Sequence, residues 1–197
     1  MLCNNIILFA DGTQLQNSAP PQQVDELIQS MQQCVHDVKS WMTHNKLKLN
    51  DDKTEALIIS APRISNSIPL PDSLTVGNST VRFSQSTKYL GITLGVHFTM
   101  TAHVVNLIRT ANFELRHINS IKHYLSVQAT ETLVLAFVLS RLEYCNSLLS
   151  GCPQYLLNRL QKVQNNAARI ILQATRTDHI TPHLRTLHWL PIDARIK

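Results

Sequence analysis

The sequence predicts an α+β protein of two parts: an antiparallel sheet with one long helix over residues 1–95, and an all-helical bundle over residues 96–197. Short apolar runs separated by turn residues fill the first part, whereas apolar residues recur at steps of three and four after His97. The charge changes at the same place. Residues 1–98 hold 7 Lys/Arg and 8 Asp/Glu, a net charge of −1, and residues 99–197 hold 11 and 5, a net charge of +6.

The first part reads as a sheet with a single amphipathic helix. Residues 6–16 predict a β-hairpin whose tight turn is Asp11-Gly12. After two prolines, apolar residues at steps of three and four predict a helix from Val24 to about Asn45. The other predicted strands are Glu55–Ser60, Ser73–Val76, Ser79–Phe83 and Thr87–Gly95. Gly91 within the last strand suggests either a bulge or a close approach by another backbone.

The second part predicts three long helices. They run from Thr101 to about Tyr124, from a cap at Ser126 to about Ser150, and from Pro153 to Gln173, and a short helix begins at Thr181-Pro182. The middle helix is apolar on most sides over Leu133–Leu139, so we expect it to be central. Both tryptophans, Trp41 and Trp189, are predicted to lie in the core.

Several features bear on compartment and partners. No apolar run reaches the roughly 18–20 residues needed to span a bilayer, so no membrane is expected. Cys3, Cys34, Cys145 and Cys152 are widely spaced and are interpreted as free thiols of an intracellular, reducing compartment, the nucleus or the cytoplasm. The cations on the polar side of the last long helix fit either a nucleic-acid backbone or a solvated face; they are Arg159, Lys162, Arg169 and Arg176.

Two groups of residues raise the question of a metal site. Asp11 offers one exposed carboxylate at a hairpin tip, and one carboxylate is a poor site for divalent cations. His179 and His183 are four residues apart, with His188 nearby, but Pro182 disfavours the continuous helix that would place the first two on one face.

The residues Phe9–Leu15 (Phe-Ala-Asp-Gly-Thr-Gln-Leu) resemble the F/Y-A-D-D-T-Q-L signature of reverse transcriptases of non-LTR (LINE-type) retrotransposons. Five further blocks resemble the same family and keep its order, so the resemblance extends over most of the chain. They are Trp41–Glu55, Lys88–Ile92, Ser140–Leu149, Leu160–Arg169 and Asp178–Pro191.

This resemblance implies the fold of a right-hand polymerase. Residues 1–95 would be a partial palm, the antiparallel sheet plus helix, and residues 96–197 a helical thumb and the region that follows it. The resemblance further implies an RNA template and an RNA–DNA duplex as partners, and Mg²⁺ as cofactor. The matching primer-grip strand contains Lys88, Tyr89, Leu90 and Gly91.

The resemblance also indicates where catalysis would fail. In the family, two aspartates of the hairpin and a third carboxylate on an upstream strand hold two Mg²⁺ ions for nucleotidyl transfer. Asp11 matches the first aspartate, Gly12 stands at the second, and the upstream strand and fingers have no counterpart in these residues. Lys53 matches a lysine proposed to protonate the leaving pyrophosphate. We therefore expect a relative of RNA-directed DNA polymerases that is catalytically inactive and binds no Mg²⁺ productively.

Two other interpretations remain open from the sequence. One is a non-catalytic nucleic-acid-binding or helical interaction module that has kept the thumb. The other is a degenerate open reading frame without a selected function.

Overall fold

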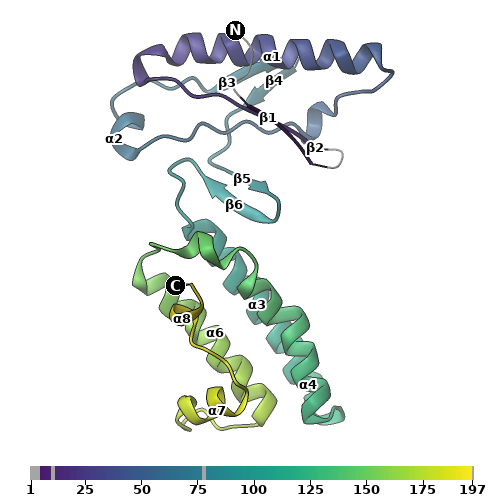
Figure 1. Cartoon of the computed structure of the whole chain (residues 1–197), viewed down its shortest axis with the longest axis vertical. Helices are drawn as coiled ribbons and strands as arrows, with labels where there is room; N and C mark the ends of the chain where they lie inside the picture. Colours follow the sequence, from purple (N-terminus) through teal and green to yellow (C-terminus); the bar gives the residue numbers. More distant parts are fainter. Residues whose placement is uncertain (1–4, 10–11, 77–78, 197) are drawn as a thin grey trace. The chain divides into compact units, whose positions relative to one another are not determined.

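The computed structural model describes residues 5–9, 12–76 and 79–196. The chain forms two compact units (Figure 1). The strand unit comprises Met1–Tyr89 and Gly95–Phe98, and the helical unit comprises Leu90–Leu94 and Thr99–Lys197. The chain thus passes between the units three times near residues 89–99, where the sequence predicted a single boundary at residue 95.

The first element is the predicted hairpin. Strand β1 (Asn5–Phe9) pairs antiparallel with β2 (Gly12–Gln16), and Phe9 lies opposite Gly12. Gly12 is therefore the first residue of β2. Asp11 itself lies outside the described residues.

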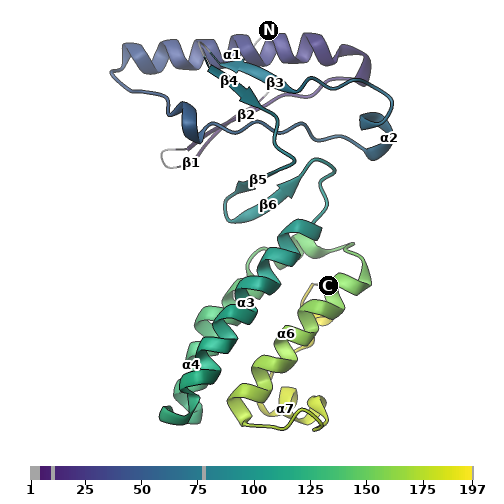
Figure 2. The same ribbon diagram turned by 180° about the vertical axis from the view of Figure 1, so that it is seen from behind.

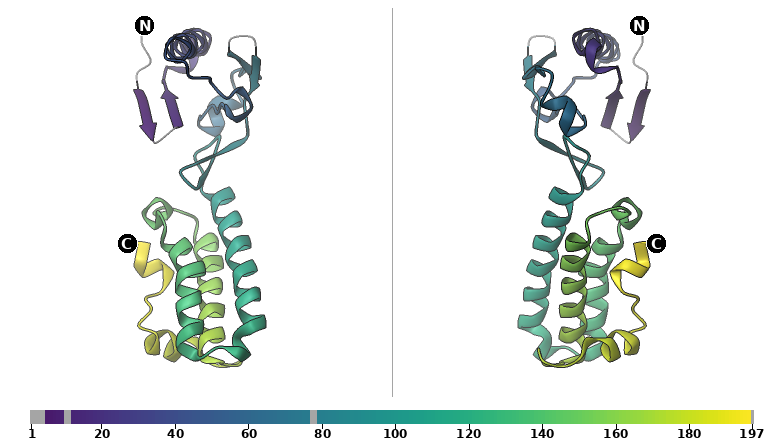
Figure 3. Two further views of the ribbon diagram at one scale, coloured as in Figure 1. Left: turned by 90° about the vertical axis from the view of Figure 1, so that its right-hand side faces the viewer. Right: turned by 90° about the vertical axis from the view of Figure 1, so that its left-hand side faces the viewer.

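Helix α1 (Val24–His44) matches its predicted bounds, after the short 3₁₀ turn η1 (Pro21–Gln23). It contacts strand β3 (Ser73–Val76), and Figure 3 shows it end-on between the hairpins β1–β2 and β3–β4. Two predictions on this helix are wrong. Trp41 is exposed rather than in the core, and Cys34 is disulfide-bonded rather than a free thiol.

The predicted strand Glu55–Ser60 does not form. Within it, one bridge joins Ala56 to Phe83 in parallel, and the Ser60 N–H donates to the Val96 carbonyl at 2.9 Å. Two isolated contacts are too few to make a ladder, so the segment is extended without being a strand. The 3₁₀ turn η2 (Asp51–Lys53) precedes it and the short helix α2 (Pro62–Ser65) follows it.

The strand unit has little core of its own. The predicted hairpin of β3 with β4 (Ser79–Arg82) is present, and Leu74 and Val76 of β3 are buried. Among the described residues of this unit, Cys34 is the only other buried apolar side chain, whereas Ile6, Leu8, Trp41, Leu47, Ile59 and Phe98 are exposed. Burial of apolar area is the main favourable term in folding, so this unit gains little stability from packing.

The predicted strand Thr87–Gly95 is in fact a hairpin. Strands β5 (Ser86–Tyr89) and β6 (Ile92–Gly95) form the third two-stranded sheet, and Leu90 and Gly91 connect them with φ values of 45° and 83°. Positive φ at both central residues is typical of a type I′ turn, whose twist matches that of the flanking strands. The Tyr144 hydroxyl donates to the Leu90 carbonyl at 2.8 Å and so supports the turn.

The helical unit begins with two predicted helices. Helix α3 (Thr101–Ile121) continues into the 3₁₀ turn η3 (Lys122–Tyr124). Ser126 caps α4 (Val127–Val134) as predicted, because its hydroxyl accepts the Ala129 N–H at 3.1 Å. The helix continues through a π-helical segment, η4 (Leu135–Leu139), and α5 (Ser140–Glu143).

This second helix differs from the prediction in two ways. It ends at Glu143 rather than about Ser150, because Cys145 adopts a left-handed φ of 54° before the 3₁₀ turn η5 (Asn146–Leu149). It is also not central, since Leu135 and Phe137 are exposed to solvent.

Helix α6 (Gln154–Leu172) takes the central place instead. It contacts α3, α4, α7 (Ile180–Thr186) and α8 (Ile192–Ile196), and Figure 2 shows it beside α3. Its inner face is buried along its whole length, as is Trp189, which confirms the predicted place of that tryptophan. The buried residues of α6 are Leu156, Leu157, Leu160, Val163, Gln164, Ala167, Ala168 and Ile171.

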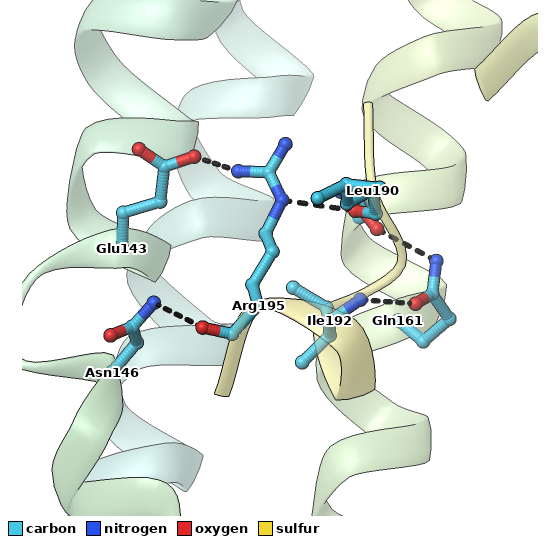
Figure 4. A network of polar contacts seen from close by, with 7 residues as sticks. Glu143, Asn146, Gln161, Leu190, Ile192 and Arg195 are labelled. Carbon is cyan, nitrogen blue, oxygen red and sulfur yellow. Dashed lines mark hydrogen bonds and ion pairs between the residues drawn. The ribbon is translucent and has the colours of Figure 1, made fainter. Parts of the chain in front are cut away.

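Polar bonds hold the last residues against the bundle (Figure 4). The Arg195 guanidinium pairs with Glu143, and its Nε donates to the Leu190 carbonyl at 2.9 Å. Gln164, fully buried, donates from Nε2 to the same carbonyl at 2.9 Å and accepts from Gln161 at 2.8 Å. Gln161 Oε1 in turn accepts the Ile192 N–H at 2.8 Å. The two bonds of Gln164 satisfy a fully buried amide that would be costly to leave unpaired.

We expect the turn at residues 90–91 to respond to substitution in opposite directions. Leu90→Asn should raise the free energy of unfolding by about 1 kcal/mol, because asparagine tolerates left-handed φ better than leucine. Gly91→Ala should lower it by about 1–2 kcal/mol. A Cβ at position 91 would lie 3.5 Å from Tyr144 Cε1, an ordinary contact, so that cost comes from the backbone. Urea unfolding measures both changes, and equal effects of the same sign would contradict the turn.

The folded protein should also lose stability as the pH is lowered, because His103 is buried. This histidine is buried, its Nδ1 accepts the Thr93 N–H at 3.5 Å, and burial lowers its pKa below the ordinary value of 6.5. As the pH falls below 6.5, the unfolded chain takes up this proton before the folded chain does, so stability is lost toward acid.

His103→Gln, which keeps an acceptor but does not titrate, should reduce that loss. Urea midpoints at about pH 7.5 and about pH 5.5 test this. An identical loss in the wild type and the variant would refute the role of His103.

Candidate nucleic-acid interface

The helical unit contains a cleft of about 680 Å³ between α3 and the C-terminal end of α6. We call it the arginine cleft, because four of its lining residues are arginines and none is acidic. The residues that line it are Arg109, Asn112, Leu115, Arg116, Asn119, Asn166, Arg169, Ile170, Ala174 and Arg176.

One face of α3 supplies half of this lining. Arg109, Asn112, Arg116 and Asn119 follow one another at steps of three, four and three, which places them on one side of a helix. The neighbouring positions Ala111, Leu115 and Ile118 are among the buried residues of the bundle. The apolar stripe of α3 therefore faces the core, and its Arg/Asn stripe lies at the edge of the contact with α6.

The end of α6 supplies the opposite wall. Asn166 and Arg169 lie in its last two turns, where the helix dipole favours a cation. Gln173 then adopts a left-handed φ of 52°, and the Ala174 N–H donates back to the Arg169 carbonyl at 3.0 Å. This cap ends the helix and turns the chain, so that Arg176 also reaches the cleft.

The carboxylates nearby are engaged with other groups. Glu114 of α3 lies 3.8 Å from Arg141 and does not line the cleft. Asp178 accepts the Thr175 N–H at 2.7 Å. Hydrogen bonds from Thr175 lower the pKa of Asp178, with smaller contributions from the charges of His183 and Arg169. The cleft thus keeps a positive field that its own lining does not neutralise.

Arg169 has unused hydrogen-bonding capacity. Its Nη2 makes one long bond, 3.4 Å, to the Asp178 carbonyl, and its Nε is buried without a partner among the described residues. A guanidinium carries five N–H donors in a fork that matches phosphate oxygens. Arg169 would therefore lose few bonds if it turned toward an anion.

The cleft contains half of the cations that the sequence suggested. Arg169 and Arg176 line it, whereas Arg159 and Lys162 are exposed on α6 outside the lining. They precede Arg169 by ten and seven residues, about 15 and 10 Å along the helix axis. Arg109 and Arg116 were missed, although their Arg/Asn spacing on α3 is visible in the sequence.

Of the two predicted catalytic residues, Asp11 and Lys53, the described part of the chain includes only Lys53. Gly12 pairs with Phe9 in the hairpin and offers no side chain, and Asp11 lies outside the described residues. Lys53 is exposed on η2. The predicted primer-grip residues Lys88, Tyr89, Leu90 and Gly91 form the end of β5 and the turn after it rather than the middle of a strand.

The described part of the chain also lacks a metal site built from side chains. No group of three or more His, Cys, Asp or Glu residues converges there. Helix α7 does run through Pro182, contrary to expectation, but His179 stands at its N-cap, one residue before the helix begins. The donors needed to fit two Mg²⁺ ions are therefore not brought together by the described residues.

Comparisons with protein-family models, with curated proteins and with solved structures find no match. Among the described helices, none is both long and apolar enough to cross a bilayer.

Proposed function

We propose that this chain is a palm-and-thumb relative of LINE-type reverse transcriptases that no longer polymerises and whose helical unit binds nucleic acid by its phosphates. The observation that carries the proposal is the arginine cleft, with four arginines and no carboxylate in its lining. The six ordered sequence blocks support the family, and the net charge of +6 in the second half supports a polyanion as partner.

Phosphate is the anion that best fits this lining. Arginine binds phosphate through paired N–H bonds, and asparagine can bond phosphate or sugar oxygens. Binding to a nucleic-acid backbone releases counterions, so the affinity must fall steeply with salt. A helical interaction module that binds another protein through Leu135 and Phe137, which are exposed on η4, would show no such dependence.

The loss of polymerisation rests on position 12. Nucleotidyl transfer needs two Mg²⁺ ions, which neutralise the charge that develops on the phosphates. Glycine at this position removes one of the two carboxylates that the family places on the hairpin. Asp11 alone would leave too few oxygen ligands for the pair of ions.

We expect the double variant R169Q/R176Q to weaken RNA binding and to flatten its salt dependence. If both arginines contact phosphates, the slope of log affinity against log salt should drop by roughly 1.4–1.8. Filter binding or fluorescence anisotropy between about 50 and about 200 mM salt measures this slope.

The matched control is R159Q/K162Q, which removes the same number of positive charges from α6 outside the cleft. Equal effects of the two double variants would refute the cleft as the binding site. A flat salt response of the wild type would refute nucleic-acid binding altogether.

We expect the purified chain, given Mg²⁺, a primed RNA template and deoxynucleotides, to produce no extension. Gly12→Asp alone should not restore activity, because the third carboxylate of the family's site has no counterpart among these 197 residues. Denaturing gels of labelled primer, with an active LINE-type enzyme as the positive control, test this. A primer lengthened by the unmodified chain would overturn the assignment.

A further inference from the structure

One aromatic side chain next to the arginine cleft in sequence is exposed and does not belong to the core. Phe113 of α3 is 48% exposed. It lies four residues after Arg109 and three before Arg116, both in the cleft lining, so it is their neighbour on the helix surface. Asn112, which also lines the cleft, precedes it directly. Phe113 is thus an exposed ring on the helix surface between two arginines of the cleft lining.

The ring of Phe113 is held from one side. His117, one turn further along α3, packs against it with ring centroids 4.2 Å apart and planes inclined by 47°. This contact limits the rotamers of Phe113 and leaves the rest of the ring in water. A fixed, exposed aromatic ring loses little side-chain entropy when a flat partner stacks on it.

We propose that Phe113 stacks on an unpaired base of a strand whose phosphates lie in the arginine cleft. The inference rests on the proposed function and specifies the kind of nucleic acid that binds: one with exposed bases rather than a fully paired duplex. Proteins that bind single strands combine a positive groove with aromatic side chains on which bases stack. In a duplex the base faces are covered by their neighbours, so Phe113 would find no partner there.

The charge around the ring favours this occupant over an apolar protein surface. Arg109 and Arg116 flank Phe113 on α3, and a protein that covered the ring would also have to cover these two cations. A nucleic-acid strand offers both a flat base for the ring and negative phosphates for the two arginines, because every nucleotide carries a base and a phosphate. Asn112 can further bond a base edge or a ribose hydroxyl.

The structure offers a matched control for the test. Phe137 on η4 is 45% exposed, almost as much as Phe113, but does not adjoin the cleft lining in sequence. Leucine at either position keeps an apolar side chain of similar helix propensity and removes the aromatic face. The variants F113L and F137L therefore make the same change, and only F113L removes a ring beside the cleft lining.

The experiment measures binding of the full chain to three labelled probes of about 12 nucleotides: single-stranded RNA, single-stranded DNA and a blunt RNA–DNA duplex. We expect the wild type to prefer both single strands. F113L should weaken single-strand binding by roughly 5- to 100-fold and leave duplex binding unchanged. F137L should change neither, and F113W should retain or increase single-strand affinity.

The outcomes separate this inference from the function on which it rests. If R169Q/R176Q lowers affinity while F113L does not, or if the duplex binds as tightly as the strands, the stacking role of Phe113 is wrong and phosphate binding stands. If R169Q/R176Q and salt both have no effect, the proposed function itself fails. Should F113L fold poorly by circular dichroism, a loss of single-strand preference in F113W would still count against stacking.

Discussion

The burial of α6 is the constraint on which the helical unit depends. Four other helices pack on this one, and its inner face is closed along nineteen residues. A single polar side chain, Gln164, lies in that face, and it is accommodated because both ends of its amide are bonded. The same packing fixes the side of α6 that faces α3, and so determines which residues form the opposite walls of the arginine cleft. The position of the candidate interface thus follows from the packing of the core, because the cleft is lined by residues at the edge of the contact between α3 and α6.

The long helices could be predicted from the sequence because their signals are redundant. In α1, α3 and α6, apolar residues recur at steps of three and four over five turns, so one misleading residue changes little. The hairpin of β3 and β4 was equally clear, because Gly77-Asn78 separates two alternating runs. Where a single residue decides the structure, prediction failed. Leu90 adopts a positive φ in the turn between β5 and β6, and Cys145 does so at the end of α5, although neither residue type signals a turn.

Two of the four arginines of the candidate site could be predicted from the sequence. Arg169 and Arg176 attracted attention because they follow the polar side of one helix. Arg109 and Arg116 become relevant only when α3 is seen to pack on α6, and this pairing is tertiary information. Trp41 shows the opposite error: its position in the apolar pattern of α1 suggested burial, but the described residues of the strand unit provide no partner to cover it. Periodicity shows which face of a helix is apolar, and it leaves open whether anything packs against that face.

The uneven distribution of buried residues implies that the chain does not open as one cooperative block. The helical unit encloses a continuous cluster of apolar side chains, whereas the described residues of the strand unit enclose three. Local opening is easiest where few apolar contacts must be broken. Amide hydrogens of β1 to β4 should therefore exchange with solvent through frequent small openings, and those of α3 and α6 only through rare, large ones. The strand unit should thus be cut by proteases more readily than the helical unit, which contains the arginine cleft.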